Sequence, residues 1–331
     1  LPDPASFHRF LGIDDGALIG GASATLNMGQ QFAGWSGGES AFLHAYGDAG
    51  TVFAALPFVQ HWTRARHAGL RVALEDFSLA AAAAKEGRAG EARDAATRQA
   101  VKHGWHLDAA GYAALLRAAC KSAGVTILPG AGAQPRVSDG RLDRVELANG
   151  VSVAADLFVD ADGALIGLLD PQGAVEINGL CDRLIRGSAA PLDPLPLYSR
   201  VAAHEAGWAT LIPLGDRLGI EFAYDSANMS DDAARTGLSQ LAGRPVEMGM
   251  TEAVSAASRT RPWVSNCVAI GRAAADTPLL DGAELLLLQL AVAQLVLLWP
   301  IDCAAMPEAD IYNDELNGSR ARVGEFTAEH F

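Results

Sequence analysis

Hydrophobic positions change their spacing several times along the chain, and each spacing predicts a different element. In HLDAAGYAALLRAACKSAG, residues 106–124, apolar residues recur at helical spacing, with Asp108 near the start and Gly124 at the end. Carboxylates favour a helix N-terminus, and glycine favours the position just beyond a C-terminus. This segment is therefore predicted to be an amphipathic helix. Similar patterns predict helices over 2–14, across most of 57–122, over 230–243 with Ser230 as N-cap, and over 311–331.

Alternating or continuous apolar runs predict strands, at 24–35, 124–131, 141–163, 198–214 and 217–226. The run 141–163 reads as two strands joined at Asn149-Gly150, a dipeptide that favours a type I′ hairpin turn. Its second strand is apolar and leads into the acidic sequence DADG, which indicates a buried strand that delivers a loop to a site. The Gly-rich stretch 36–50 reads as a loop.

A third pattern joins a short apolar strand, a Gly, a Pro-containing loop and a long apolar helix within 265–299. The run 285–301 has 17 residues, includes Gln289 and Gln294, and lacks a basic flank. A membrane span needs about 20 apolar residues, so a buried helix ended by Pro300 is the better interpretation.

Charge and cysteine content narrow the possible partners. The 331 residues carry a formal net charge of -14, whereas binding to nucleic acid or to an anionic membrane needs clustered Lys and Arg. We therefore expect neither partner. Four cysteines lie far apart without a CxxC pair, which favours reduced core residues of a cytoplasmic protein over metal ligands or disulfides. They are Cys120, Cys181, Cys267 and Cys303.

Several familiar catalytic patterns are missing from the sequence. No HxxxH or HExxH spacing predicts a metal site, and there is no GxSxG elbow, Walker loop or GxGxxG loop. Two features nevertheless indicate a dinucleotide: the strand that ends in DADG, and the strand, loop and helix N-terminus of 265–289. A helix N-terminus offers free N–H groups to phosphate, to a flavin carbonyl or to a halide. Together they favour an FAD-type α/β fold.

Longer stretches carry a specific resemblance. FHRFLGIDDGALI, GWHLDAAGYAALLRAA, ADLFVDADG, EAGWATLIPL and PWVSNCVAIGRAA, in this order, resemble the flavin-dependent tryptophan halogenase family. The resemblance implies an α/β (α+β) fold of the FAD-dependent monooxygenase kind. It also implies reduced FAD from a separate flavin reductase, chloride or bromide as halide, and a small aromatic substrate such as an indole. Hypohalous acid would reach this substrate through a tunnel.

The family's catalytic residues carry over with substitutions. The resemblance places the catalytic Lys eight residues before Trp35, where this chain has Asn27. An amide forms no haloamine and is a weak proton donor. The catalytic Glu, ten residues after Gly271, becomes Asp281, and the signature WxWxIP begins at Trp208. The second Trp of this signature is replaced by Thr210.

The remaining site residues follow from the same resemblance. The predicted catalytic positions are Asp281 and Asn27. The predicted substrate and tunnel residues are His44, Trp208, Thr210, Ile212 and Pro213. The predicted cofactor residues are Asp160, Asp162, Gly163, Gly271, Pro278, Gly282 and Ala283. For Asp281 an ordinary N-cap of the following helix stays an equal alternative, and Trp208 alone would more often be a core residue. We expect Asp281, Asn27 and Thr210 to line one cavity.

The resemblance also bears on domain organisation. It implies one partial FAD-binding domain over 1–331 with an inserted sheet or substrate region at about 175–262, without the family's N-terminal glycine-rich βαβ unit and C-terminal helices. The chain begins with Leu, which favours a partial record of a longer protein, while Asn27 and Thr210 favour divergence. Because the resemblance implies that the glycine-rich unit that binds pyrophosphate is missing, we expect Asn27→Lys alone not to restore halogenation.

Three functions stay open at this point. The first is a halogenase-like oxidoreductase of reduced competence. A homodimer is compatible with it. The others are a non-catalytic relative and a flavin monooxygenase or oxidase on the same fold.

Overall fold

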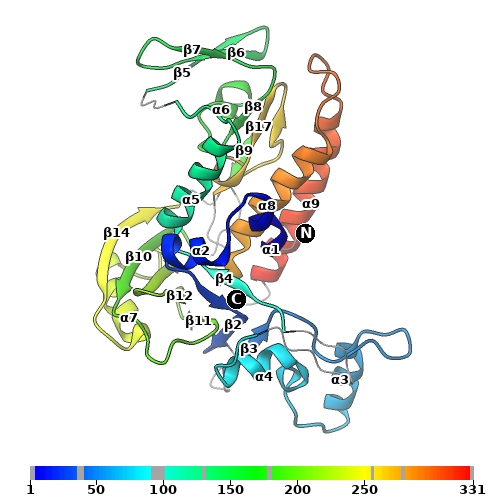
Figure 1. The fold of residues 1–331 in the computed structure, drawn as a ribbon, viewed down its shortest axis with the longest axis vertical. Helices are drawn as coiled ribbons and strands as arrows, with labels where there is room; N and C mark the ends of the chain where they lie inside the picture. Colours follow the sequence, from blue (N-terminus) through cyan, green and yellow to red (C-terminus); the bar gives the residue numbers. More distant parts are fainter. Residues whose placement is uncertain are drawn as a thin grey trace.

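The computed structural model describes residues 4–35, 41–90, 101–128, 132–176, 181–254, 257–276 and 280–328. The largest sheet among these residues has seven strands. The strand order is β14-β10-β13-β12-β11-β2-β3, and only β11 and β2 pair in parallel. The strands are β2 Gly29–Ala33, β3 Phe42–Ala45, β10 Arg183–Ala189, β11 Ser199–His204, β12 Gly207–Pro213, β13 Leu218–Tyr224 and β14 Glu247–Ala253. Five of them lie within the predicted 175–262 region, and β2 and β3 extend the sheet from the N-terminal part of the chain (Figure 1).

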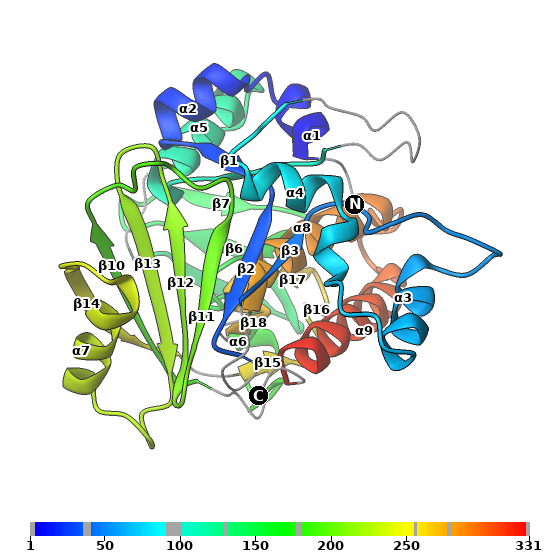
Figure 2. The same cartoon turned by 90° about the horizontal axis from the view of Figure 1, so that it is seen from below.

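The two faces of this sheet contact different layers. On one face Ile185, Ile220 and Phe222 pack against Ala234 and Leu238 of helix α7, Asp231–Ala242 (Figure 2). As predicted, the Ser230 hydroxyl caps α7 by accepting from the Ala233 amide at 3.3 Å. The other face, here called the inner face, turns toward the remainder of the molecule.

A second, smaller sheet stands behind the inner face. It has the order β16-β17-β8, with β17 (Cys267–Ala269) parallel to β8 (Phe158–Asp160) and antiparallel to β16 (Trp263–Val264). Helices α8 (Ala283–Leu297) and α9 (Glu308–Ala328) cover it, with Trp263 and Tyr312 in an edge-to-face contact at 5.5 Å between ring centroids.

Smaller units complete the described fold. The three-stranded units are β5 Gln134–Ser138, β6 Arg141–Glu146 and β7 Ser152–Ala154, and β9 Ala174–Glu176, β15 Ala257–Arg259 and β18 Ala275–Asp276. Strand β1 Thr25–Asn27 pairs with β4 Gly104–His106. The other helices are α1 Pro4–Phe10, α2 Asp15–Ala22, α3 Phe58–His67, η1 Leu74–Phe77, α4 Leu79–Lys85, α5 Ala109–Ser122, α6 Ile166–Leu169, η2 Gly271–Ala273 and η3 Leu280–Gly282.

Most predicted elements are confirmed, and the exceptions depend on pairing. Residues 124–128 of the predicted strand 124–131 do not form a strand, because no described strand pairs with their backbone, and residues 129–131 lie outside the described residues. Residues 42–45, predicted as loop, form β3 because β2 offers an edge. The hairpin at Asn149-Gly150 is confirmed, but its turn is not type I′, and the predicted second strand is divided into β7 and β8, which belong to different sheets. Only Gly150 has a positive φ, and its amide bonds the Leu147 carbonyl, as in a longer hairpin loop.

Helix α8 is confirmed as a helix, but the prediction that it is buried is wrong. Ala291 and Leu295 are buried, whereas Val296 is 68% exposed and Leu297 77%. Its apolar residues surround the whole helix, and the described neighbours cover only one side. Among the described residues no helix has both the length and the apolar content needed to cross a membrane.

The cysteines follow the core prediction only in part. Cys181 and Cys267 are buried, Cys303 is half-buried and Cys120 is exposed, and all four are free. Burial raises the pKa of the Cys181 and Cys267 thiols to about 12, so both stay protonated at neutral pH.

Candidate functional site

A cavity of about 500 Å³ lies at the carboxyl ends of the parallel strands β8 and β17. Because these ends share one edge of the sheet, the loops that follow them meet there, which is where open α/β sheets commonly bind ligands. Strands β9 and β15 close the other side. The cavity is lined by Ala161, Asp162, Gly163, Ala174, Ala257, Ser258, Arg259, Arg272, Ala273, Ala274 and Asp276.

Asp160 organises the first of these loops. Its side chain is 2% exposed, and its carboxylate accepts four backbone N–H groups, from Asp162 and Gly163 on Oδ1 and from Leu165 and Ile166 on Oδ2, at 2.7 to 3.2 Å. The acceptor groups of this carboxylate are therefore turned to the loop and not to the cavity. Asp160 is absent from the cavity lining, so it shapes the wall indirectly.

The predicted residues Asp162 and Gly163 line the cavity directly. Gly163 has a φ of +93° and Gly271 one of +53°, conformations in which a side chain is strained. Both loops therefore need glycine at these turns. The exposed Asp162 carboxylate accepts from the Ala164 amide at 3.0 Å, which leaves acceptor capacity toward the cavity.

Two arginines of the cavity were not among the predicted site residues. Arg259 on β15 donates from Nε to the Ala273 carbonyl and from Nη1 to the Asp170 carbonyl, each at 3.1 Å. Arg272 pairs with the Asp276 carboxylate at 2.9 Å, and its side chain is 66% exposed. Only pairing of β15 with β9 and β18 brings Arg259 here, so the local sequence carried no signal for it.

The inner face of the large sheet brings a second group of predicted residues together. Trp208, Phe32 and Val201 form one buried cluster with Leu280 of η3, the residue before Asp281. Trp208 is 4% exposed, as expected for a core residue. Thr210 follows on the same face of β12 opposite Val201 and is half-buried. The backbone at Asp281 therefore lies next to the sheet face that carries Trp208 and Thr210.

Asn27 lies at the end of β1 and is 8% exposed. Its amide nitrogen donates to the Tyr46 hydroxyl at 3.2 Å, and its amide oxygen accepts from the Gly29 amide at 3.0 Å. His44 on β3, two residues before Tyr46, is exposed. Asn27 thus already has local partners. The predicted cavity shared by Asn27, Thr210 and Asp281 stays a prediction, because the Asp281 side chain lies outside the described residues.

The entrance of α8 differs from the N-cap alternative for Asp281. The N-cap residue is Gly282, with a φ of +62°, and glycine has no side chain with which to cap the helix. Ala283 starts the helix and is buried, while Gly282 is exposed. Pro278 lies outside the described residues.

Sequence reasoning missed a buried hydrogen-bond chain beside Asn27. The Thr25 hydroxyl donates its single proton to the carbonyl of Pro213, a predicted tunnel residue, and lies 2.9 Å from His106 Nδ1. Thr25 must therefore accept from an Nδ1–H, which fixes the tautomer of the neutral ring. Burial lowers the pKa of His106 to about 3. This chain joins β1, β4 and β12. The sequence HLD gave no signal for it, because Thr25 is 81 residues away.

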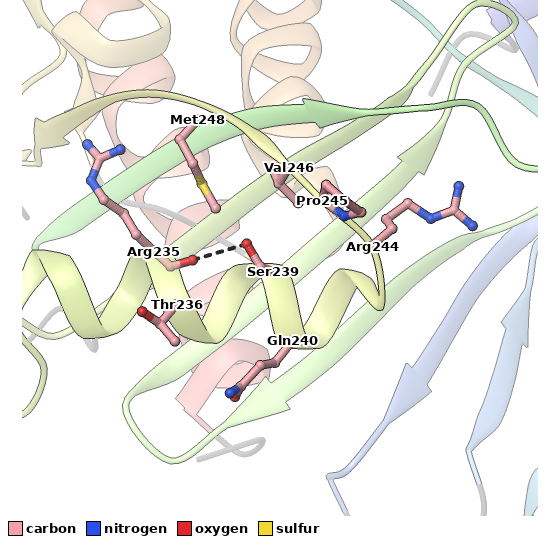
Figure 3. A pocket seen from close by; sticks show the side chains of 8 residues that line it. All are labelled: Arg235, Thr236, Ser239, Gln240, Arg244, Pro245, Val246 and Met248. Carbon is pink, nitrogen blue, oxygen red and sulfur yellow. Dashed lines mark hydrogen bonds between the residues drawn. The ribbon is translucent and has the colours of Figure 1, made fainter.

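A groove of about 570 Å³ lies between α7 and β14 (Figure 3). It is lined by Arg235, Thr236, Ser239, Gln240, Arg244, Pro245, Val246 and Met248. None of the predicted site residues lines it, so the smaller cavity at β8 and β17 is the better candidate.

Comparisons with known proteins identify the family of this chain. A family profile described as tryptophan halogenase matches residues 1–331. The chain is 26% identical to tryptophan 7-halogenase KtzQ of Kutzneria sp. (strain 744), over 98% of this chain and 66% of KtzQ. It is 28% identical to tryptophan 6-halogenase SttH of Streptomyces toxytricini, over 69% of this chain and 46% of SttH. The chain thus spans at most about two thirds of these relatives.

Solved structures share the fold. BrvH, a flavin-dependent halogenase from Brevundimonas sp. BAL3, superposes with a TM-score of 0.88 at 28% identity, over 99% of this chain and 69% of BrvH. Xcc4156, a flavin-dependent halogenase from Xanthomonas campestris, gives 0.86 at 26% identity, over 99% and 68%. The mixed α/β fold is therefore that of flavin-dependent halogenases. With a profile match along its whole length, the chain belongs to the tryptophan halogenase family.

Proposed function

We propose that this chain contributes the flavin-binding and substrate-facing parts of a flavin-dependent halogenase-like oxidoreductase that acts on a tryptophan-like aromatic substrate. The observation that carries the proposal is the cavity at the carboxyl ends of β8 and β17. It combines a preformed concave volume with a few convergent polar groups, as small-molecule sites do. The relatives named tryptophan halogenases support the substrate class.

The residues that line the cavity fit part of an FAD molecule. Gly163 and small alanines keep the wall close to the backbone, Asp162 offers a carboxylate to sugar hydroxyls, and Arg259 offers N–H donors to phosphate. Gly271 opens the adjacent turn. Bound reduced FAD would supply oxygen activation. The chain's own part is to bind and orient it.

The inner face of the large sheet would form the substrate side. Asn27, at the end of β1 and two residues before β2, is the residue where the family resemblance places a catalytic Lys, and its amide is bonded to Tyr46 and Gly29. An amide keeps its proton at every working pH and cannot act as an ammonium acid. Asp281 would be the remaining acidic group. We therefore propose a halogenase of reduced control over the halogenating species, with chloride or bromide as halide and a separate flavin reductase as partner.

A second candidate is a flavin monooxygenase or oxidase with the same cavity. The specific observation in its favour is again Asn27, which supplies an amide, bonded to Tyr46 and Gly29, in place of the ammonium proposed to steer halogen. A non-catalytic relative would keep the cavity as a binding site only. A homodimer is compatible with each of these.

The test combines flavin titration with product analysis. The protein is mixed with FAD, a flavin reductase, bromide and tryptophan, and the products are identified by mass spectrometry and chromatography. We expect FAD to bind, and we expect a mixture of bromotryptophans that matches the mixture made by added hypobromous acid. A single regioisomer would contradict the role given to Asn27. Product no greater than in a protein-free control would contradict halogenation and favour the second candidate.

A further inference from the structure

Arg259 is held rigidly at the wall of the cavity. The side-chain Nε and Nη1 of Arg259 donate to the Ala273 and Asp170 carbonyls. Its backbone N–H donates to the Ala274 carbonyl at 2.9 Å, and its backbone carbonyl accepts from the Arg320 guanidinium at 3.1 Å. Three separate segments therefore fix the side chain and backbone of one arginine. Such a guanidinium is oriented before any ligand arrives, so binding costs little side-chain entropy.

The Arg259 guanidinium has N–H donors and a positive charge that its protein partners do not use. It has five N–H donors, and the two side-chain bonds use two of them. None of the ion pairs among the described residues includes Arg259, whereas the neighbouring Arg272 is paired with Asp276. A chain with a net charge of -14 thus places a cation without a carboxylate partner at a cavity wall.

The other groups of the cavity define which anion would fit. Asp162 lies on the loop after β8, so a compact, highly charged anion would be repelled on that side, whereas Asp276 on β18, beside the strand of Arg259, is paired with Arg272. A ligand whose anionic group lies at one end and whose hydroxyl groups lie at the other matches both sides.

We propose that Arg259 is an anion anchor that binds the pyrophosphate of a flavin dinucleotide, with Asp162 directed to hydroxyl groups of the same ligand. The proposal rests on the proposed function and assigns one contact within it. It predicts that the site distinguishes flavins by their phosphate groups.

The experiment measures the binding of FAD, riboflavin and ADP to the full chain by fluorescence and calorimetry. Arg259→Met removes the charge, and Arg259→Lys retains it without the planar fork. Arg261→Met is the matched control, because Arg261 is exposed, two residues away and absent from the cavity lining. Circular dichroism checks that each variant folds.

Arg259→Met should weaken FAD and ADP by about 10- to 100-fold, the range expected for losing charge-assisted hydrogen bonds. Riboflavin should bind equally to wild type and variant, Arg259→Lys should lose less, and Arg261→Met should change nothing. An equal loss for all three ligands would show a merely structural role and overturn the proposal, as would unchanged FAD and ADP binding.

The same measurements separate this inference from the proposed function. If the wild type binds FAD and riboflavin with equal affinity, the proposed flavin site is retained and the role of Arg259 as an anchor is rejected. If the wild type binds ADP through Arg259 but binds neither flavin, the role of Arg259 as an anion anchor is retained and the proposed flavin site is rejected. If the wild type binds none of the three ligands, both proposals are rejected.

Discussion

The cavity wall and the inner face of the large sheet are built on opposite principles. The wall depends on polar bonds to the backbone, since the Asp160 carboxylate accepts four N–H groups. The inner face depends on apolar packing of Trp208 against Phe32, Val201 and Leu280. A polar wall fixes one loop conformation, whereas apolar packing tolerates exchange of neighbouring side chains. The comparison teaches that the cavity wall is constrained locally, whereas the inner face can diverge where the volume of the exchanged side chains is kept.

The largest expected effect is on the packed face. Trp208→Ala should lower the free energy of unfolding by about 3–5 kcal/mol, because it leaves a cavity among buried side chains. Urea unfolding measures this loss. The matched control is Trp299→Ala, since Trp299 is 60% exposed and should change stability by about 0.5 kcal/mol or less. Equal effects of the two substitutions would remove the distinction between the face and the surface.

The polar wall should respond nearly as strongly. Asp160→Ala strands four backbone N–H groups at a residue that is 2% exposed, and we expect a loss of about 3 kcal/mol in the free energy of unfolding. Asp162→Ala, at an exposed carboxylate that accepts a single amide, should cost about 1 kcal/mol or less. If both variants unfolded at the same urea concentration, Asp160 would not organise the loop.

A pH measurement tests the hydrogen-bond chain at the edge of the inner face. Burial lowers the pKa of His106 to about 3, below its ordinary value of 6.5, so the unfolded chain binds the proton more readily. Its contribution is therefore full above pH 6.5 and falls as the pH drops toward 3. Between pH 7 and pH 5 wild type should lose about 2 kcal/mol more than His106→Asn. Parallel stability curves would contradict a buried neutral ring.

The smallest effect is expected at Thr210. Its half-buried hydroxyl has no hydrogen bond within the described part of the chain, so Thr210→Val should change the free energy of unfolding by about 0.5 kcal/mol or less. Differential scanning calorimetry can detect this. A loss above about 1 kcal/mol would show that the inner face is polar at this point and would blur the comparison.

Local patterns predicted the elements well and their neighbours poorly. Ser230 and Asp108 cap their helices as expected, because capping depends on residues three positions away. The run 125–128 looked like a strand and β3 looked like a loop, because pairing depends on segments distant in sequence. For the same reason the sequence did not predict the position of Arg259 or the hydrogen bond between Thr25 and His106, since both depend on long-range contacts.

The predicted site divides in the same way. Asp162 and Gly163 were predicted because the loop directly follows its strand in sequence, and both line the cavity. Asp160 was assigned to the cofactor, yet its carboxylate is turned to the loop, since a sequence does not reveal where a side chain points. The catalytic and tunnel assignments, from Asn27 to Pro213, stay predictions.

The uncovered side of α8 gives the protein a built-in optical reporter. Of the six tryptophans, Trp208 and Trp263 are buried in apolar surroundings, while Trp299 lies just past α8 with 60% of its surface exposed. Indole emission shifts to longer wavelengths in water, so Trp299 should dominate the red edge of the spectrum and be quenched first by acrylamide. A molecule that bound over Val296, Leu297 and Trp299 would shift the emission of Trp299 to shorter wavelengths, so binding could be detected without a label.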